Sequence, residues 1–269
     1  ALSDKIGELF EEPETKPNTD GYMGHEAGDV DLSDEDIEKY ANWKEIKDLQ
    51  EELVNSVTTL LNTGVISEDL SVKINSLLSS GITKESINEI QELVNNEASA
   101  ECAETETLTD SEKVQEYLDS LSVTARDNIL EQTGGISEIV SITDYKNGTY
   151  KINTKNENSS VVVFPSGKYT MSYNDEKRTG FDTYDEEGKI ISSTFIDHAR
   201  NEAVIQENTS YNEDGSSVKT TTNSNEPNIK EIVDFSSENE ITSIKTENTE
   251  TGEITVNYSK DGECGSMEG

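Results

Sequence analysis

The spacing of apolar residues changes once along the chain, near residue 135. Before this point they recur every three or four residues, as on one face of a helix. After it they alternate with polar residues in segments such as 150–154, 161–164 and 168–173, and turn signals such as Asn147-Gly148 separate these segments. The pattern predicts an α+β protein, with helices first and an antiparallel β-meander of about ten strands after them.

Helix-capping residues divide the first half of the chain. Ser33 with Asp36 has the form of a capping box, in which a hydroxyl and a carboxylate bind free backbone amides, and it predicts a helix to about Asn62. Segments 60–70 and 77–87 are similar in sequence. In each, a glycine is expected to end one helix, and Ser67 or Thr83 is expected to begin the next. A second capping box, beginning at Thr109, predicts helices near 110–120 and 124–133. We therefore expect an N-terminal helical bundle.

These patterns divide the chain into four parts. Residues 1–32 are acidic and contain prolines, so we expect a flexible acidic arm. Residues 33–135 form the expected helical domain and residues 136–262 the antiparallel β-repeat domain. Residues 263–269 remain as a tail.

A short motif recurs among the predicted strands. Tyr184-Asp-Glu-Glu-Gly188, Tyr211-Asn-Glu-Asp-Gly215 and Tyr258-Ser-Lys-Asp-Gly262 share it, and Phe235-Ser-Ser-Glu-Asn239 carries Asn in the glycine position. Gly or Asn supplies the positive φ that a tight turn requires. We interpret the β-meander as built from Tyr-x-x-x-Gly repeats, with shortened copies that begin at Tyr145 and Phe164.

The motif resembles the YD repeats of RHS-type bacterial surface and toxin proteins and, more loosely, the MORN-type repeats of bacterial antitoxin-like proteins. The resemblance covers roughly residues 140–262. YD repeats usually carry Arg-Leu after the glycine, where this chain has Lys189-Ile190 or Ser216-Ser217. The resemblance implies a β-repeat architecture and an extracellular or cell-surface bacterial setting. A toxin shell would need many more copies than this chain holds.

Composition adds a thin core and an acidic surface. Hydrophobic residues make up 31% of the 269 residues, and the net charge is −36. Such a charge repels nucleic acid and anionic lipid, so neither is an expected partner, and no apolar run is long enough for membrane insertion. Basic proteins and divalent cations remain as partners, although the charge also serves solubility alone.

A calcium site is the one metal site that the sequence suggests. Asp29, Asp31 and Asp34 follow Gly28 as acids do in the second half of a calcium-binding loop. The first half of that loop lacks the oxygen ligands that calcium requires. The same acids are also explained by the preference of carboxylates for the N-terminal end of a helix.

Four strand tyrosines are candidate binding residues. Aromatic rings stack on sugars, and this would give Tyr173, Tyr184, Tyr211 and Tyr258 a role in glycan binding; cross-strand packing is the alternative.

Catalytic signatures are not found. His25 and His198 are the only histidines, and carboxylate pairs are too numerous to be diagnostic. Cys102 and Cys264 could pair with each other, pair between chains or stay free. We therefore expect no enzyme and no cofactor other than calcium.

We accordingly expect a non-catalytic, secreted or surface-displayed bacterial protein with a structural or adhesive function. The alternative is a soluble binding module that captures a basic protein or a glycan. Strands that are polar on both faces, such as residues 217–224, predict a sheet that is partly a single layer. Its edges would then allow self-association.

Overall fold

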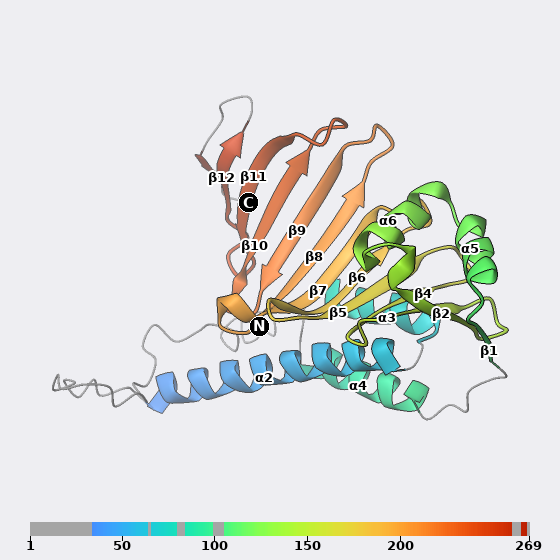
Figure 1. Ribbon diagram of the computed structural model, residues 1–269. Helices are drawn as coiled ribbons and strands as arrows, with labels where there is room; N and C mark the ends of the chain where they lie inside the picture. The colour runs from blue at the N-terminus through green and yellow to red at the C-terminus, as the bar shows by residue number, and fades with distance from the viewer. Residues whose placement is uncertain (1–33, 64–65, 80–83, 99–104, 260–264, 268–269) are drawn as a thin grey trace, which may run out of the picture.

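The computed structural model describes residues 34–63, 66–79, 84–98, 105–259 and 265–267. The described part of the chain starts with three helices, α2 (Asp34–Thr63), α3 (Glu68–Ser79) and α4 (Lys84–Ala98), as the apolar spacing predicts. Strand β1 (Glu106–Leu108) and helices α5 (Ser111–Ser120) and α6 (Val123–Thr133) follow (Figure 1). The expected arm, residues 1–32, lies outside the described residues. No described helix has the length and apolar character needed to cross a membrane.

The strands of the second half of the chain, together with β1, form one antiparallel sheet. Its thirteen strands lie side by side in sequence order from β1 to β13, and every neighbouring pair is antiparallel. This confirms the α+β class and the meander. The strands are β2 (Ile139–Asp144), β3 (Tyr150–Thr154), β4 (Ser159–Val163), β5 (Tyr169–Asn174), β6 (Arg178–Tyr184), β7 (Ile190–Asp197), β8 (Ala203–Tyr211), β9 (Ser217–Asn223), β10 (Glu226–Phe235), β11 (Ile241–Asn248), β12 (Ile254–Ser259) and β13 (Gly265–Met267).

Helix ends follow the capping signals with one correction. The Oγ of Ser67 accepts the amide of Leu70 at 3.2 Å, as its place before α3 predicts. Helix α5 is capped by Asp110, one residue after the predicted Thr109, because its carboxylate accepts the amides of Glu112 and Lys113. Ser33 and Thr83 lie outside the described residues.

The helices form two layers on opposite faces of the sheet, which differs from the expected single bundle. Helices α2, α3 and α4 share a core with Val162, Phe164 and Phe181, and we call this side the α2 face. Helices α5 and α6 share a second core with alternate residues of the same strands, including Val161 and Tyr169, and we call that side the α6 face. Each helix thus buries its apolar side against a strand surface, because successive strand residues point to opposite faces.

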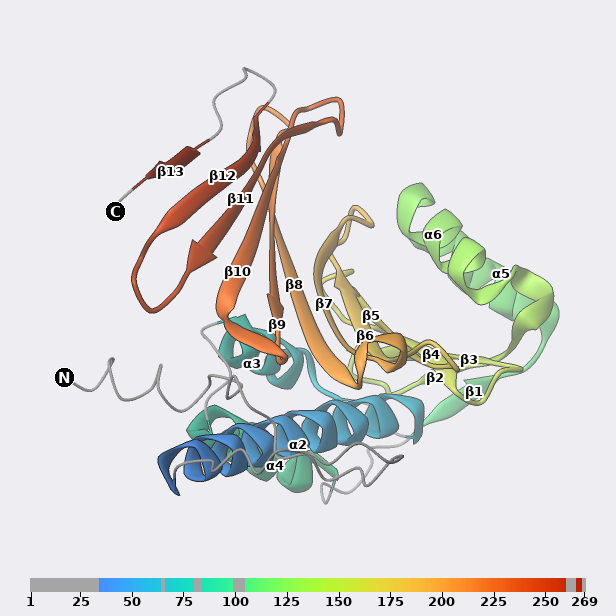
Figure 2. The ribbon, with the colours of Figure 1, turned by 90° about the vertical axis from the view of Figure 1, so that its left-hand side faces the viewer.

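The end of the sheet extends beyond both helix layers. Among the described residues of β9 to β12, Val233 and Val256 are the only buried hydrophobic residues. Figure 2 shows these strands rising away from α2 and α4, with α5 and α6 at the other end of the sheet. Within the described residues, the prediction of a partly single-layered sheet is therefore confirmed for this region, which we call the open half (β9 to β12).

Three turns after an aromatic residue have the same geometry. In the first turn the amide of Asp185 donates to the carbonyl of Lys189, and the amide of Gly188 donates to the carbonyl of Asp185. The same two hydrogen bonds occur in the turns that begin at Asn212 and at Ser236. Gly188, Gly215 and Asn239 have φ of 82°, 84° and 62°, as predicted for these positions.

The expected shortened copies differ from these turns. Phe164 and Tyr145 occupy the first position inside the turn, because their own amides bind Lys168 and Thr149. Relative to the turn, Phe164 and Tyr145 therefore correspond to Asp185, one residue after Tyr184. Phe164 packs in the core of the α2 face. One residue of displacement reverses the face of a strand residue, so these two segments are not shortened copies with the same packing.

Candidate binding surface on the α6 face

One row of side chains crosses the α6 face from a covered to an open environment. Strand register places these residues directly opposite one another, strand by strand, so all lie on the same face. Under α5 and α6 the row is apolar, and from β6 onward it is acidic or hydroxylated. The row runs Leu108, Ile142, Ile152, Val161, Met171, Asp182, Ser193, Glu207, Thr221, Glu231, Thr246 and Thr255.

The register also places all four predicted binding tyrosines on the α6 face. Tyr184 is buried and stacks on Tyr169, with ring centroids 4.7 Å apart and an interplanar angle of 6°. Tyr173 is partly buried beside Phe195. Tyr211 and Tyr258 are exposed. The tyrosines share a face but do not converge on one point; Tyr211, at the end of β8, and Tyr258, in the open half, are the accessible ones.

Tyr211 is held in place although it is exposed. Its hydroxyl donates to the carbonyl oxygen of Ile190 at 3.0 Å, and the Nζ of Lys189 lies 5.4 Å from its ring centroid. These contacts connect the end of β8 to the turn between β6 and β7. A fixed aromatic ring loses little conformational freedom when a partner packs on it.

A second group lies where the covered and open parts meet. Tyr173, Gly180 and Phe195 are directly opposite one another on β5, β6 and β7. The guanidinium carbon of Arg178 is 4.8 Å from the ring centroid of Tyr173 and 5.2 Å from that of Phe195. The distances indicate a cation–π contact with both rings. We call Tyr173, Arg178, Asp182 and Phe195 the arginine cluster.

Asp182 is the acidic member of the arginine cluster. Burial raises the pKa of this carboxyl, whereas hydrogen bonds from Ser193 and Tyr173 and the charge of Arg178 act in the opposite direction. The Tyr173 hydroxyl donates to Asp182 Oδ1 at 3.0 Å. Burial and the neighbouring Asp182 also raise the pKa of Tyr173, so this tyrosine stays a donor at neutral pH. The carboxyl of Asp182 and the phenol of Tyr173 are thus shielded, and β8 alone separates the cluster from the open half.

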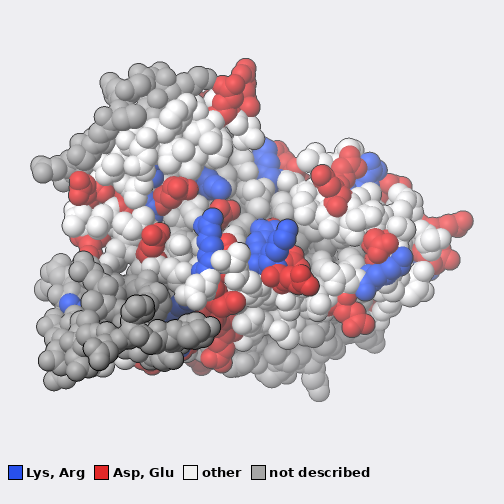
Figure 3. Space-filling view, turned by 60° about the vertical axis from the view of Figure 1, so that its left-hand side comes forward, with Lys and Arg blue, Asp and Glu red and all other residues white. Residues whose placement is uncertain are grey.

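Charges on the open half alternate in sign. Lys219 of β9 pairs with Glu207 of β8 at 3.0 Å. On the opposite face Lys230 pairs with Glu247 and Lys245 with Asp234, at 3.4 and 2.6 Å. Figure 3 shows Lys and Arg in the middle of the visible surface, among Asp and Glu, with uncharged residues over most of the remaining described surface. Charges of mixed sign alternate locally despite the strong net negative charge.

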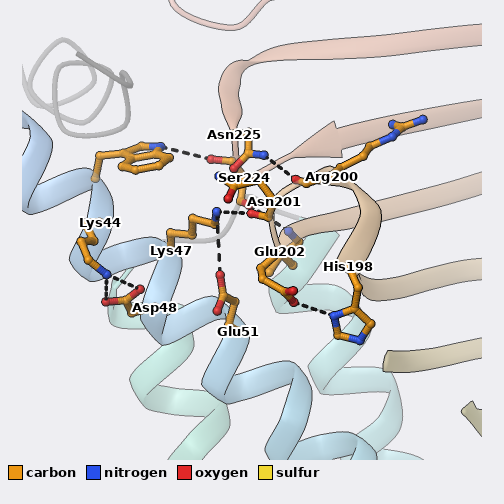
Figure 4. A network of polar contacts seen from close by, with 12 residues as sticks. Lys44, Lys47, Asp48, Glu51, His198, Arg200, Asn201, Glu202, Ser224 and Asn225 are labelled. Atoms are coloured by element: carbon orange, nitrogen blue, oxygen red, sulfur yellow. Dashed lines mark hydrogen bonds and ion pairs between the residues drawn. The ribbon is translucent and has the colours of Figure 1, made fainter. Parts of the chain in front are cut away.

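The open half is anchored to α2 by a polar network (Figure 4). The indole Nε1 of Trp43 donates to the carbonyl oxygen of Ser224 at 3.3 Å, and Lys47 Nζ donates to that of Asn201 at 2.5 Å. Asn225 Nδ2 binds the carbonyl oxygen of Arg200 at 2.9 Å, which connects the two loops. Asn201 has a φ of 55°, a left-handed conformation, and the hydrogen bond from Lys47 to its carbonyl oxygen helps to hold it.

His198 belongs to the same corner of the sheet. Its Nδ1 lies 2.6 Å from a carboxylate oxygen of Glu202 and its Nε2 lies 3.0 Å from Thr179 Oγ1. Both ring nitrogens thus have partners that hold the corner between β7 and β8.

The predicted metal and cysteine positions fall mostly outside the described residues. Asp29, Asp31, Cys102 and Cys264 are not described, and Asp34 is the first residue of α2, with its side chain outside the description. Within the described ranges no three or more His, Cys, Asp or Glu residues are arranged to hold a metal ion. Calcium binding by residues 29–34 stays a prediction.

Comparison with known proteins returned no relative. No protein-family model matches the sequence, and no curated protein or solved structure matches it either.

Sequence reasoning identified Tyr173 but missed the other members of the arginine cluster. Arg178 and Asp182 lie two residues on either side of Gly180, and this alternation on a predicted strand would have placed them on one face. Phe195 lies across the hairpin whose turn ends at Gly188, so the turn motif fixes its register. The available signal was therefore the repeat motif itself, used to pair the strands.

Proposed function

We propose that the protein is a non-catalytic binding protein of the adhesive kind, which holds a basic protein partner on the α6 face. The observation that carries this proposal is the row that changes from apolar to acidic and hydroxylated where the helix layer ends. Its open part exposes Glu231 and is flanked by the accessible rings of Tyr211 and Tyr258. Carboxylates, hydroxyls and fixed aromatic rings are groups that bind Lys and Arg side chains.

The covered part of the protein supports this function as a scaffold. Helices α2 to α4 on one face and α5 and α6 on the other bury the apolar strands β2 to β7. The open half is attached to this unit by the sheet itself and by Trp43 and Lys47. We further propose that the turns after Tyr184, Tyr211 and Phe235 are copies of one repeat, as in the surface proteins that the motif resembles. That resemblance also motivates the proposed extracellular bacterial setting.

The net charge of −36 favours the approach of basic partners over a long range, and it makes non-specific attraction a necessary control. The test therefore compares two charge reversals of equal size. Glu231→Lys changes the open half of the α6 face, and Glu85→Lys changes an exposed residue of α4 in the helix layer of the other face. A fluorescent oligo-arginine peptide is the probe, and its affinity is measured at several salt concentrations.

We expect Glu231→Lys to weaken binding of the peptide by about tenfold relative to Glu85→Lys. Equal losses in the two variants would show that the net charge alone attracts the peptide and would overturn the proposal. Binding of neutral glycans by the wild-type protein, with no preference for the peptide, would support the glycan alternative.

A further inference from the structure

The contacts of Arg178 differ from those of the other basic side chains on the α6 face. Lys219 and Lys189 each lie within ion-pair distance of a glutamate. Among the described residues Arg178 has no carboxylate at such a distance, and its guanidinium is instead placed over the rings of Tyr173 and Phe195. The residue as a whole is exposed, so its head group is held by ring faces at the surface.

The two rings are fixed independently of Arg178. Phe195 is 8% exposed and packs with Ala203, Ile205 and Tyr173. The Tyr173 hydroxyl is bound to Asp182, which also interacts with Ser193 of the next strand. Rings and carboxylate would thus keep their places if the arginine side chain moved away.

Gly180 allows the rings to stand close together. It lies between Tyr173 and Phe195 on the α6 face, and a Cβ atom built there would be 2.5 Å from Phe195 Cβ and 2.2 Å from Thr194 O. Any side chain at this position would therefore collide with β7. The space above the glycine is bordered by two aromatic rings and one carboxylate, which is a suitable environment for a planar cation.

We propose that Tyr173, Asp182 and Phe195 form a subsite for a guanidinium or ammonium group, and that Arg178 occupies this subsite until a basic side chain of a partner replaces it. This deepens the proposed function and rests on it, since it names one place on the α6 face where a basic partner is recognised. The exchange leaves the charge and the type of contact in the subsite unchanged, because one cation over the two rings is replaced by another. No bond is made or broken.

The exchange depends on the exposure of Arg178. An exposed side chain on a hairpin strand can rotate into solvent, where water solvates its charge. The residue next to it, Lys177, has the same charge but lies in the turn, where its amide binds Asp175 and its carbonyl accepts the His198 amide. Lys177 therefore provides a matched control for the loss of one positive charge.

The test uses N-acetyl-arginine amide as the probe and follows the aromatic NMR signals of the full chain. In Arg178→Ala, and in Arg178→Gln as a second variant that keeps some packing on the rings, the probe should bind about tenfold more tightly than to wild type. In Lys177→Ala the affinity should stay at the wild-type value. Adding Phe195→Leu to Arg178→Ala should abolish the gain.

Equal gains in Arg178→Ala and Lys177→Ala would overturn the subsite, since the effect would then be net charge alone. A gain that survives Phe195→Leu would overturn it as well. If the oligo-arginine peptide distinguishes Glu231→Lys from Glu85→Lys while the arginine probe does not respond to Arg178→Ala, the proposed function stands and the subsite fails. If the probe responds and the peptide does not distinguish the two variants, the subsite stands and the proposed function fails.

Discussion

The Nζ of Lys151 lies 2.7 Å from the carbonyl oxygen of Asn62, near the C-terminal end of α2. This lysine is buried on β3, and its ammonium group binds one of the carbonyls that the last turn of a helix leaves without an intrahelical partner. The contact therefore attaches the longest described helix to the sheet through an ammonium group. Next to it, Ser160 and Ser172 hydroxyls donate to the Asn62 side chain at 3.4 and 2.6 Å.

Lys151 predicts a stability that depends on pH. Burial lowers the pKa of this lysine from 10.5 to about 8. Because the unfolded chain then binds the proton more strongly than the folded one, the free energy of unfolding should rise between about pH 8 and pH 10. Urea denaturation of wild type and Lys151→Met over this range measures the effect. As the pH rises, the free energy of unfolding of wild type should increase relative to that of Lys151→Met. A difference in unfolding free energy that stays constant over this range would contradict the expectation.

Asp182→Asn should stabilise the protein at neutral pH. Burial raises the pKa of Asp182, so the ionised carboxylate is less favourable in the folded state than in the unfolded chain, and stability is lost as pH rises through the folded pKa. The amide oxygen of Asn can still accept the Tyr173 hydroxyl. Urea denaturation should show the advantage of Asp182→Asn at pH 7 and its decrease on acidification. The exposed Glu231→Gln is the control and should change stability by no more than about 0.5 kcal/mol.

Gly188→Ala should lower the free energy of unfolding by about 1–2 kcal/mol, the cost of a left-handed conformation for a residue with a Cβ. Gly188 has a φ of 82°, and a Cβ there would lie 3.2 Å from the Thr124 methyl group at the start of α6. Gly188→Asn should cost less, because Asn already occupies the equivalent place at Asn239 with a φ of 62°. Thermal denaturation would contradict this reasoning if the two variants lost equal stability.

Trp43→Phe should loosen the attachment of the open half. The change keeps most of the buried ring and removes the hydrogen bond to the Ser224 carbonyl, which is worth about 1 kcal/mol. Hydrogen exchange should become faster in the turn between β9 and β10 and remain unchanged in β4 and β5. Lys44→Ala breaks only an exposed ion pair with Asp48 on the same helix, and it should leave exchange in that turn as it is.

Much of the fold follows from local signals in the sequence. The change of period at residue 135, the start of α3 at Ser67 and the positive φ of Asn239 are all readable from residues near one another. The placement of the helices is not local. Helices α2 and α6 lie on opposite faces of the same strands, and both faces of β4 are apolar or hydroxylated, so the strand pattern alone does not assign a helix to either face.

The arginine cluster combines both kinds of information. Arg178 and Asp182 share a face by simple alternation, and the turn at Gly188 sets the hairpin that brings Phe195 opposite Gly180. Burial of Asp182 depends on packing by neighbouring strands. Its carboxylate resembles many others in so acidic a sequence, and only the fold distinguishes it.

The order of the strands has a consequence for how such a sheet is made and varied. Each strand pairs with the strands immediately before and after it in the chain, so no pairing needs to wait for a distant segment. From β2 onward, pairing of neighbours closes only short loops, at a small entropic cost, and allows the sheet to extend progressively from its helix-covered part; the β1–β2 pair instead spans α5 and α6. For the same reason, a duplicated or deleted hairpin at the open half would lengthen or shorten the surface without rearranging what precedes it.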